Sequence, residues 1–389
     1  MIKPCWKKYN LGAICDFQGG SQPPKGEWRK SPERGYVRML QIRDFTKSRD
    51  FDIEYVRLSN KLRLCEKDDI LIGRYGASVG KILTGLSGAY NVALIKATPD
   101  ESIVIKPFIR RVFEAPGFQA FLANVSTQRT AQAGFSKEDI ADYDVSLPPL
   151  QEQQRIVDIL DREFSKIDAL KANAEKSLQA AKDLFQATLK KELEPKEGWK
   201  KKRLEEICKI TAELIDPTLP EYIDQIHIGG ANIIAETGVL IDLKTSREEN
   251  LISGKFPFDE TMVLYSKIRP YLKKVCCPDF QGICSADIYP LKPNQDVDRT
   301  YLYYILLSQD FTDYAILGSA RAGMPKVNRP YMFAYSCSIP EYEEQRKVAN
   351  RLDAVREQTY SLQDNYKKTL SLCDDLKQSL LHKAFNGEL

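Results

Sequence analysis

The chain has 389 residues, enough for more than one domain with its own hydrophobic core. Hydrophobic residues make up 43% of it and charged residues 29%, a composition that excludes bulk disorder. The net charge of +3 excludes a histone-like protein, so a nucleic-acid surface would have to come from the local arrangement of the 57 Lys and Arg residues.

The cysteines and the first residues indicate a reduced, cytoplasmic protein. The nine cysteines include the adjacent pair Cys276 and Cys277 and no Cys-x-x-Cys motif, so we expect neither a disulfide framework nor a zinc cluster. No apolar signal segment opens the chain, and no run approaches 18 apolar residues. We therefore expect a cytoplasmic location.

Residues 1–148 mix short strands with one interrupted helix. The apolar runs 70–72 and 92–95 are bounded by glycine and proline, which is typical of buried strands. Apolar residues at helical spacing predict a helix over 108–125, and Pro116 followed by Gly117 should interrupt it.

At Pro148 and Pro149 the pattern changes to a long helix. Residues 151–193 contain no proline or glycine, and their apolar residues alternate steps of three and four. The predicted seam consists of Val157, Leu160, Phe164, Ile167, Ala174, Leu178, Ala181 and Phe185, with Lys171 as its one break. Such a helix would be about 65 Å long.

The second half of the chain repeats the first. Trp6 recurs as Trp199 at an offset of 193, and Pro148 recurs as Pro340 at an offset of 192. A near-constant offset over half the chain indicates one tandem duplication. A second long helix follows Pro340, with a predicted seam of Val348, Leu352, Val355, Leu362, Tyr366, Leu370, Cys373, Leu376 and Leu380. We expect the two helices to pair as an antiparallel coiled coil, in an α/β (α+β) protein with pseudo-two-fold symmetry.

The known catalytic motifs are missing from the sequence. Residues 76–81 resemble the end of a phosphate-binding P-loop, but Tyr75 occupies the required glycine position and Ile82 replaces the magnesium-binding Ser or Thr. The only two histidines, His227 and His382, fall in different predicted elements, which excludes histidine-based triads and disfavours a metal site. Methyltransferase and nuclease motifs are also missing. We therefore predict no catalytic residues, no metal and no cofactor in this chain.

Two equivalent loops have the composition of a DNA contact. Residues 73–81 follow the predicted strand 70–72, and residues 266–274 take the same place in the second half. Cations at both loop ends, with aromatic and polar residues between them, suit phosphate clamping and base-edge contacts; the alternative is a solvated turn. The candidate DNA-binding residues are Arg74, Tyr75, Ser78, Lys81, Lys267, Arg269, Tyr271, Lys273 and Lys274.

A second pair of segments precedes each long helix. Residues 128–134 and 321–329 are rich in Gln, Asn and Arg, the side chains that read adenine and guanine bidentately. Their candidates are Gln128, Arg129, Arg321, Lys326, Asn328 and Arg329. Weaker candidates lie at 21–25 and at Arg38, Gln41 and Arg43.

The chain resembles the specificity subunits of Type I restriction-modification enzymes over its full length. The residues that carry the resemblance are the strand and loop 69–81, the segment 147–157 with its Pro-x-x-x-Glu-Gln opening, and the C-terminal segment 377–389. The second copy departs from the first, because it has Ile339-Pro340 for the double proline and lacks the loop glycines.

The resemblance implies target recognition domains at 1–148 and 195–339, and conserved spacer helices at 149–194 and 340–389. Each domain would read one half of a split, non-palindromic site in double-stranded DNA. The helices would set the gap and dock two modification subunits, and two restriction subunits where the system has them, with Glu152, Gln153, Glu344 and Gln345 at the docking junctions. S-adenosylmethionine, ATP and magnesium would then bind the partner subunits.

Two other interpretations remain open from the sequence. A fused nuclease or methyltransferase would be active as the isolated chain. A coiled-coil adaptor that binds only proteins would show no salt-dependent affinity for DNA.

Overall fold

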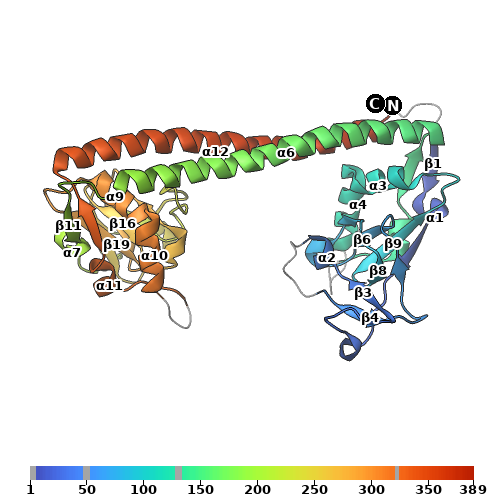
Figure 1. The fold of residues 1–389 in the computed structure, drawn as a ribbon, viewed down its shortest axis with the longest axis horizontal. Helices are drawn as coiled ribbons and strands as arrows, with labels where there is room; N and C mark the ends of the chain where they lie inside the picture. The colour runs from blue at the N-terminus through green and yellow to red at the C-terminus, as the bar shows by residue number, and fades with distance from the viewer. Residues whose placement is uncertain (1–5, 47–52, 128–133, 320–323) are drawn as a thin grey trace. The chain divides into compact units, whose positions relative to one another are not determined.

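The computed structural model describes the chain except residues 1–5, 47–52, 128–133 and 320–323 (Figure 1). It contains two compact units. The first unit is Met1–Ala174 with Lys368–Leu389, and the second unit is Glu175–Lys367. Each unit therefore contains one globular domain and one half of each long helix.

The first unit contains two four-stranded sheets and one two-stranded sheet. Their strand orders are β2-β9-β6-β7, β4-β3-β8-β5 and β1-β10. The strands are β1 (Lys7–Asn10), β2 (Cys15–Gly19), β3 (Tyr36–Leu40), β4 (Tyr55–Arg57), β5 (Leu64–Cys65), β6 (Ile70–Gly73), β7 (Ile82–Leu83), β8 (Gly88–Tyr90), β9 (Leu94–Pro99) and β10 (Asp144–Leu147). The short helices are α1 (Leu11–Ile14), η1 (Lys25–Glu27), α2 (Ile42–Thr46), η2 (Gly76–Ser78) and α5 (Lys137–Ala141).

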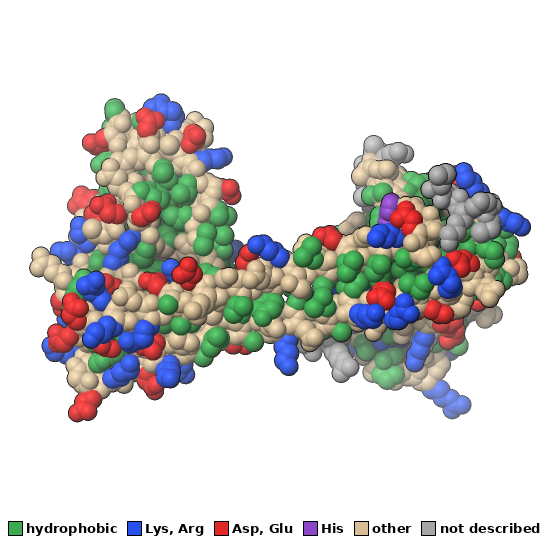
Figure 2. Space-filling view, turned by 90° about the horizontal axis from the view of Figure 1, so that it is seen from above, with side chains coloured by type: hydrophobic (Ala, Val, Ile, Leu, Met, Phe, Trp, Pro, Cys, Tyr) green, Lys and Arg blue, Asp and Glu red, His purple; other side chains and the backbone are tan. Residues whose placement is uncertain are grey.

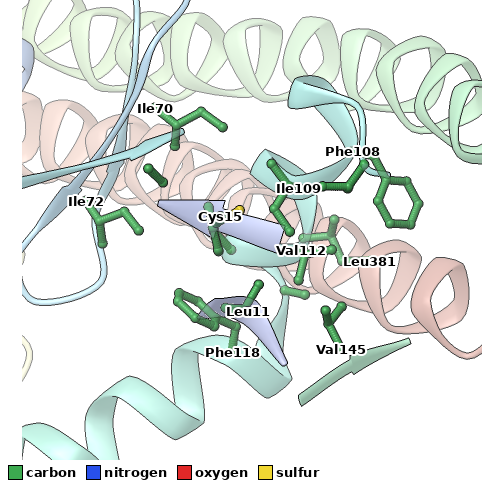
Figure 3. Close-up of a cluster of buried hydrophobic side chains, with 14 of the residues drawn as sticks. Leu11, Cys15, Ile70, Ile72, Phe108, Ile109, Val112, Phe118, Val145 and Leu381 are labelled. Carbon is green, nitrogen blue, oxygen red and sulfur yellow. The ribbon is translucent and has the colours of Figure 1, made fainter. Parts of the chain in front are cut away.

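The predicted interruption of the helix in this domain is confirmed. Helix α3 (Lys106–Glu114) ends before Ala115, and α4 (Pro116–Thr127) begins at the proline. Ala115 is extended because the proline ring excludes the helical conformation from the residue before it. Phe108, Ile109 and Val112 of α3 pack with Ile70, Ile72 and Leu381 in one buried cluster (Figure 3). The core thus joins the sheet, α3 and the end of the second long helix.

The second unit repeats this plan strand for strand. Its sheet orders are β12-β19-β16-β17, β14-β13-β18-β15 and β11-β20. The strands are β11 (Lys200–Arg203), β12 (Cys208–Lys209), β13 (Ile226–Ile228), β14 (Lys244–Thr245), β15 (Lys255–Phe258), β16 (Val263–Ser266), β17 (Val275–Cys276), β18 (Gly282–Ser285), β19 (Ile288–Pro293) and β20 (Ser336–Ile339). The helices are α7 (Leu204–Ile207), α8 (Ser246–Glu249), η3 (Pro270–Leu272), α9 (Arg299–Leu307), α10 (Gln309–Leu317) and α11 (Arg329–Phe333).

The long helices α6 (Leu150–Leu193) and α12 (Tyr342–Phe385) pack antiparallel, as predicted. In the first unit Lys171 pairs with Asp374 at 2.6 Å, so the one break in the predicted seam is neutralised across the helices. In the second unit Arg351 pairs with Glu192 at 2.8 Å.

The predicted seam of α12 is wrong at two positions. Leu362 and Leu376 are 42% and 49% exposed, whereas Thr359 and Gln363 are buried. Thr359 can be buried because its hydroxyl donates to the Val355 carbonyl oxygen one turn earlier in its own helix. Within the described residues, no helix is long and apolar enough to cross a membrane.

Candidate nucleic-acid interface

The 73–81 loop of the first unit links β6 to β7 through the short helix η2. Gly76 and Gly80 bracket this turn with φ values of +55° and +77°. These are left-handed conformations that glycine adopts without steric strain. The Gly80 N–H donates to the Gly73 carbonyl at 3.0 Å, which closes the loop on itself.

The 266–274 loop of the second unit keeps this backbone without the glycines. Arg269 and Lys273 stand at the positions of Gly76 and Gly80, with φ values of +49° and +46°. Between them lies η3, the counterpart of η2. The missing glycines therefore did not change the path of the loop, although left-handed arginine and lysine are strained.

In each unit the first predicted loop pairs with a described residue of the second predicted segment. An isolated β-bridge joins Tyr75 to Gly134, and an equivalent bridge joins Ile268 to Lys326. The Arg269 N–H also donates to the Pro325 carbonyl at 2.9 Å. Residues more than 50 positions apart in the sequence thus meet in each domain.

The first unit holds Arg74 but leaves Lys81 exposed. Arg74 Nε donates to the Phe135 carbonyl at 2.7 Å, and its guanidinium lies 4.9 Å from the centre of the Tyr75 ring. Tyr75 and Ser78 are half-buried. Of the two predicted loop cations, Lys81 is therefore the more exposed.

Three predicted cations of the second unit are held by groups of their own unit. Lys267 Nζ donates to the Ala286 carbonyl at 2.5 Å and pairs with Asp287 at 3.3 Å, and Lys274 Nζ donates to the Gly230 carbonyl at 2.5 Å. Lys273 is 6% exposed. Burial lowers the pKa of both Lys267 and Lys273. All three lysines thus bind groups of their own unit and position the loop.

Lys273 is held by two glutamines. Its Nζ donates to Gln309 Oε1 at 2.8 Å and to Gln186 Oε1 of α6 at 3.1 Å. Nothing in the sequence marked Gln186 or Gln309. The sequence does not distinguish a lysine that is exposed to solvent from one whose long apolar stem carries the ammonium to buried acceptors.

Arg269 and Tyr271 are exposed, Tyr271 by 50%. Lys326 pairs with Asp287 at 3.3 Å, and the Asn328 side chain caps α11 by accepting from the Tyr331 N–H. Arg329 is exposed, with its guanidinium 5.6 Å from the centre of the Phe333 ring. Three predicted residues lie outside the described part of the chain: Gln128, Arg129 and Arg321.

The weaker candidates in the first unit are paired with acidic residues. Arg38 pairs with Asp44 at 2.7 Å, and Arg43 pairs with Glu54. Gln41 Nε2 donates to Glu54 at 2.7 Å. These three side chains hold α2 against the neighbouring strands, so we assign them a structural role.

A polar hollow beside Arg74 was not predicted. Its volume is about 450 Å³, and its wall includes Arg63, Arg74 and Lys137, with Asp16 and Glu138 as acidic members. Arg63 precedes β5 and Lys137 begins α5, so no local motif connects them. They extend the cationic part of the surface beyond the predicted loop.

The two glutamines of the predicted docking junctions are buried within their own units. Gln153 is fully buried, and it accepts from the Ile105 N–H while donating to the Ile103 and Pro148 carbonyls. Gln345 makes the same three bonds, to the Asp298 N–H and to the Asp296 and Pro340 carbonyls. The glutamine of each Glu-Gln motif thus clamps the long helix to its domain. The glutamates are half-buried, and Glu152 pairs with Arg155 at 2.8 Å and Glu344 with Arg351 at 3.4 Å.

The comparisons agree with this architecture. The model of the Type I restriction modification DNA specificity domain matches residues 5–180 and again 196–371. The Type I restriction enzyme EcoDI specificity subunit of Escherichia coli is 29% identical over 287 residues, 65% of this chain. That match spans 64% of the relative, less than two thirds of its length. The Type I restriction enzyme MjaVIII specificity subunit of Methanocaldococcus jannaschii is 20% identical over 342 residues, 78% of this chain and 75% of that protein.

Two solved structures share the fold. A chain solved in a study of complex assembly and conformational transition of the type I R-M system gives a TM-score of 0.77 at 17% identity, with all of both chains covered. The HsdS subunit of Thermoanaerobacter tengcongensis gives 0.52 at 17% identity, covering 100% of this chain and 98% of that one. Paired α/β domains on antiparallel helices are thus the architecture of solved HsdS chains.

The chain belongs to the family of Type I restriction-modification specificity subunits, with two copies of the DNA specificity domain, as the resemblance predicted. Subunits of this family determine the DNA target sequence and are non-catalytic.

Proposed function

We propose that each domain of this chain reads one half of a split DNA site through the surface formed by its two adjoining segments. These are the 73–81 loop with Gly134 in the first unit, and the 266–274 loop with 325–329 in the second. The observation that carries the proposal is one loop backbone kept in both units with different exposed side chains. A loop backbone that is the same in both domains, with different exposed side chains, would let the two domains recognise two different half-sites.

We further propose domain boundaries at 148, 194 and 339, with the long helices as spacer and docking platform for two modification subunits. Each unit carries one exposed leucine from each helix that has an exposed equivalent in the other unit. These are Leu170 and Leu376 in the first unit, and the equivalent Leu362 and Leu184 in the second. Figure 2 shows hydrophobic side chains at the surface along the long helices. Matched exposed apolar pairs suit two copies of one partner.

A repeated hollow supports the same stoichiometry. In the second unit it has a volume of about 370 Å³ and is lined by Ile305 and Tyr335. In the first unit it has a volume of about 320 Å³ and is lined by the equivalent Val112 and Tyr143. Glu152 and Glu344, at the start of each helix, complete the proposed docking surface. S-adenosylmethionine, ATP and magnesium belong to the partner subunits in this proposal.

The test is to map methylated adenines in host DNA with and without this gene, with the modification subunit present. The proposal expects a gapped, two-part motif that disappears with the gene. Purified complex should bind that motif with an affinity that falls as salt rises. An unchanged methylation map, or a complex without salt-dependent DNA affinity, would instead favour a protein-binding adaptor.

A further inference from the structure

Arg269 combines exposure with backbone strain. Its φ of +49° lies in the left-handed region, which costs a non-glycine residue about 1 kcal/mol or more. The equivalent residue of the first unit is Gly76, with nearly the same φ of +55°. A glycine would therefore satisfy this backbone without strain, yet the second unit has a long cation there.

The backbone of Arg269 is held from both sides. Its N–H donates to the Pro325 carbonyl at 2.9 Å, and its carbonyl accepts from the Leu272 N–H at 2.9 Å. The side chain therefore leaves a fixed point in a fixed direction. A flexible cation would serve for phosphate attraction, whereas bidentate pairing with a base edge requires a fixed direction.

The other cations of this loop already have hydrogen-bond partners within the protein. Lys267, Lys273 and Lys274 bind groups within their own unit. The guanidinium of Arg269 has no hydrogen-bond or ionic partner among the residues that the structure describes. It is the exposed member of the loop's cations, with Tyr271 two residues away.

We propose that Arg269 reads a guanine in the half-site bound by the second domain, and that Gly76 leaves the equivalent point of the first domain without a reading side chain. The bidentate fork of arginine matches the O6 and N7 acceptors that guanine presents in the major groove. This inference rests on the proposed function. It adds the residue and the base by which the two half-sites differ.

The structure also permits the reciprocal exchange. A Cβ built at Gly76 meets nothing within 4 Å, so a side chain can leave the backbone there at the cost of the same left-handed strain that Arg269 has. At Gly80 a Cβ would lie 2.6 Å from Gln119 Oε1, so a substitution there would displace the Gln119 side chain and is less suitable. Gly35 provides a matched control, because it is exposed, has a φ of +82° and is equally open.

The experiment selects bound duplexes from a randomised DNA library, using the chain assembled with its modification subunits. Arg269→Gly should keep the motif except for one guanine in one half-site, where preference falls roughly 5- to 150-fold. Arg269→Lys keeps the charge and the strain but not the fork, so it should lose the same preference. Gly76→Arg should add a guanine preference in the other half-site, and Gly35→Arg should not.

Arg269→Gly should also raise the melting temperature, because it removes left-handed strain. The proposal is overturned if Arg269→Gly leaves the motif unchanged, or weakens binding to all sequences equally as a phosphate contact would. It is also overturned if Gly35→Arg shifts the motif as Gly76→Arg does. Failure of the proposed function gives a different result, since the unaltered complex would then enrich no motif.

Discussion

Asp161 and Asp353, at the same position of the two long helices, each accept a 2.6 Å hydrogen bond from the same position of the helix packed beneath. The donor is Arg111 of α3 in the first unit and Tyr304 of α9 in the second. The duplication thus kept the acceptor and changed the donor from a guanidinium to a phenol. Burial of Tyr304 raises its pKa well above its ordinary value, so the hydroxyl donates at any physiological pH.

Tyr304→Phe should destabilise the second unit by about 1–2 kcal/mol, since the lost bond ends on a carboxylate that is partly exposed. Urea unfolding of Tyr304→Phe, Asp353→Ala and the double variant measures the coupling between the two side chains. Tyr314→Phe, which loses a bond to the neutral Tyr331 carbonyl, is the matched control and should cost less. Additive effects of the two substitutions would contradict the pairing.

Gln345→Leu should be more damaging, because it leaves one N–H and two carbonyls without their partner. We expect a loss of about 2–5 kcal/mol in the free energy of unfolding. Glu344→Gln, one residue earlier, should change stability by less than about 0.5 kcal/mol. Equal stabilities of the two variants in chemical denaturation would show that the clamp does not hold the helix.

The repeat could be predicted from the sequence because its offset is nearly constant, and the local breaks because each depends on residues near one another. Pro116 acts on Ala115 directly, and the Lys171 break in the α6 seam is visible in the spacing. The α12 seam could not be read this way. Its leucines at 362 and 376 fit a heptad, and only packing shows that Thr359 and Gln363 take the buried positions instead.

The candidate site was predicted as two separate segments, because bridges such as Tyr75 to Gly134 join residues far apart in the sequence. The sequence also did not show which lysines of the loops are exposed and which are buried. Lys81 is exposed and Lys273 is buried, and the difference lies in two glutamines that no local pattern connects to the loop.

Lys81→Ala and Lys273→Met should therefore behave differently. Lys81→Ala should weaken binding to all DNA sequences and lower the slope of log affinity against log salt by about one unit, with unchanged stability. Lys273→Met should keep the salt slope and lower the melting temperature, since Gln186 and Gln309 lose their donor. Titrations at several salt concentrations measure the slope. A lowered slope for Lys273→Met would mean that its ammonium contacts DNA after all.

The exposed leucines allow a test of partner stoichiometry. Leu184→Arg with Leu362→Arg should remove one modification subunit from the complex and leave the second in place, because the first unit keeps Leu170 and Leu376. Size-exclusion chromatography with light scattering measures the mass of the assembly. Ile252→Arg, at a side chain 86% exposed and outside both long helices, is the control and should retain both subunits. Full assembly by the leucine variant would place docking elsewhere.

The gap between half-sites should follow the length of the helices. One heptad is inserted after Ala174 in α6 and another after Lys367 in α12. Both insertions fall at the boundary of the two units, so each unit keeps its own ion pair between the helices. Seven residues preserve the seam and lengthen each helix by about 10 Å. With DNA rising 3.4 Å per base pair, the methylated motif should gain up to about three base pairs in its gap with both half-sites unchanged.

The inserted residues also add twist between the two domains, which lowers affinity by itself, so the measurement that decides is the gap length and not the affinity. Insertion in one helix only should prevent the seam from closing and serves as the control. A double-insertion variant that methylates with the original gap would show that the helices do not set the spacing.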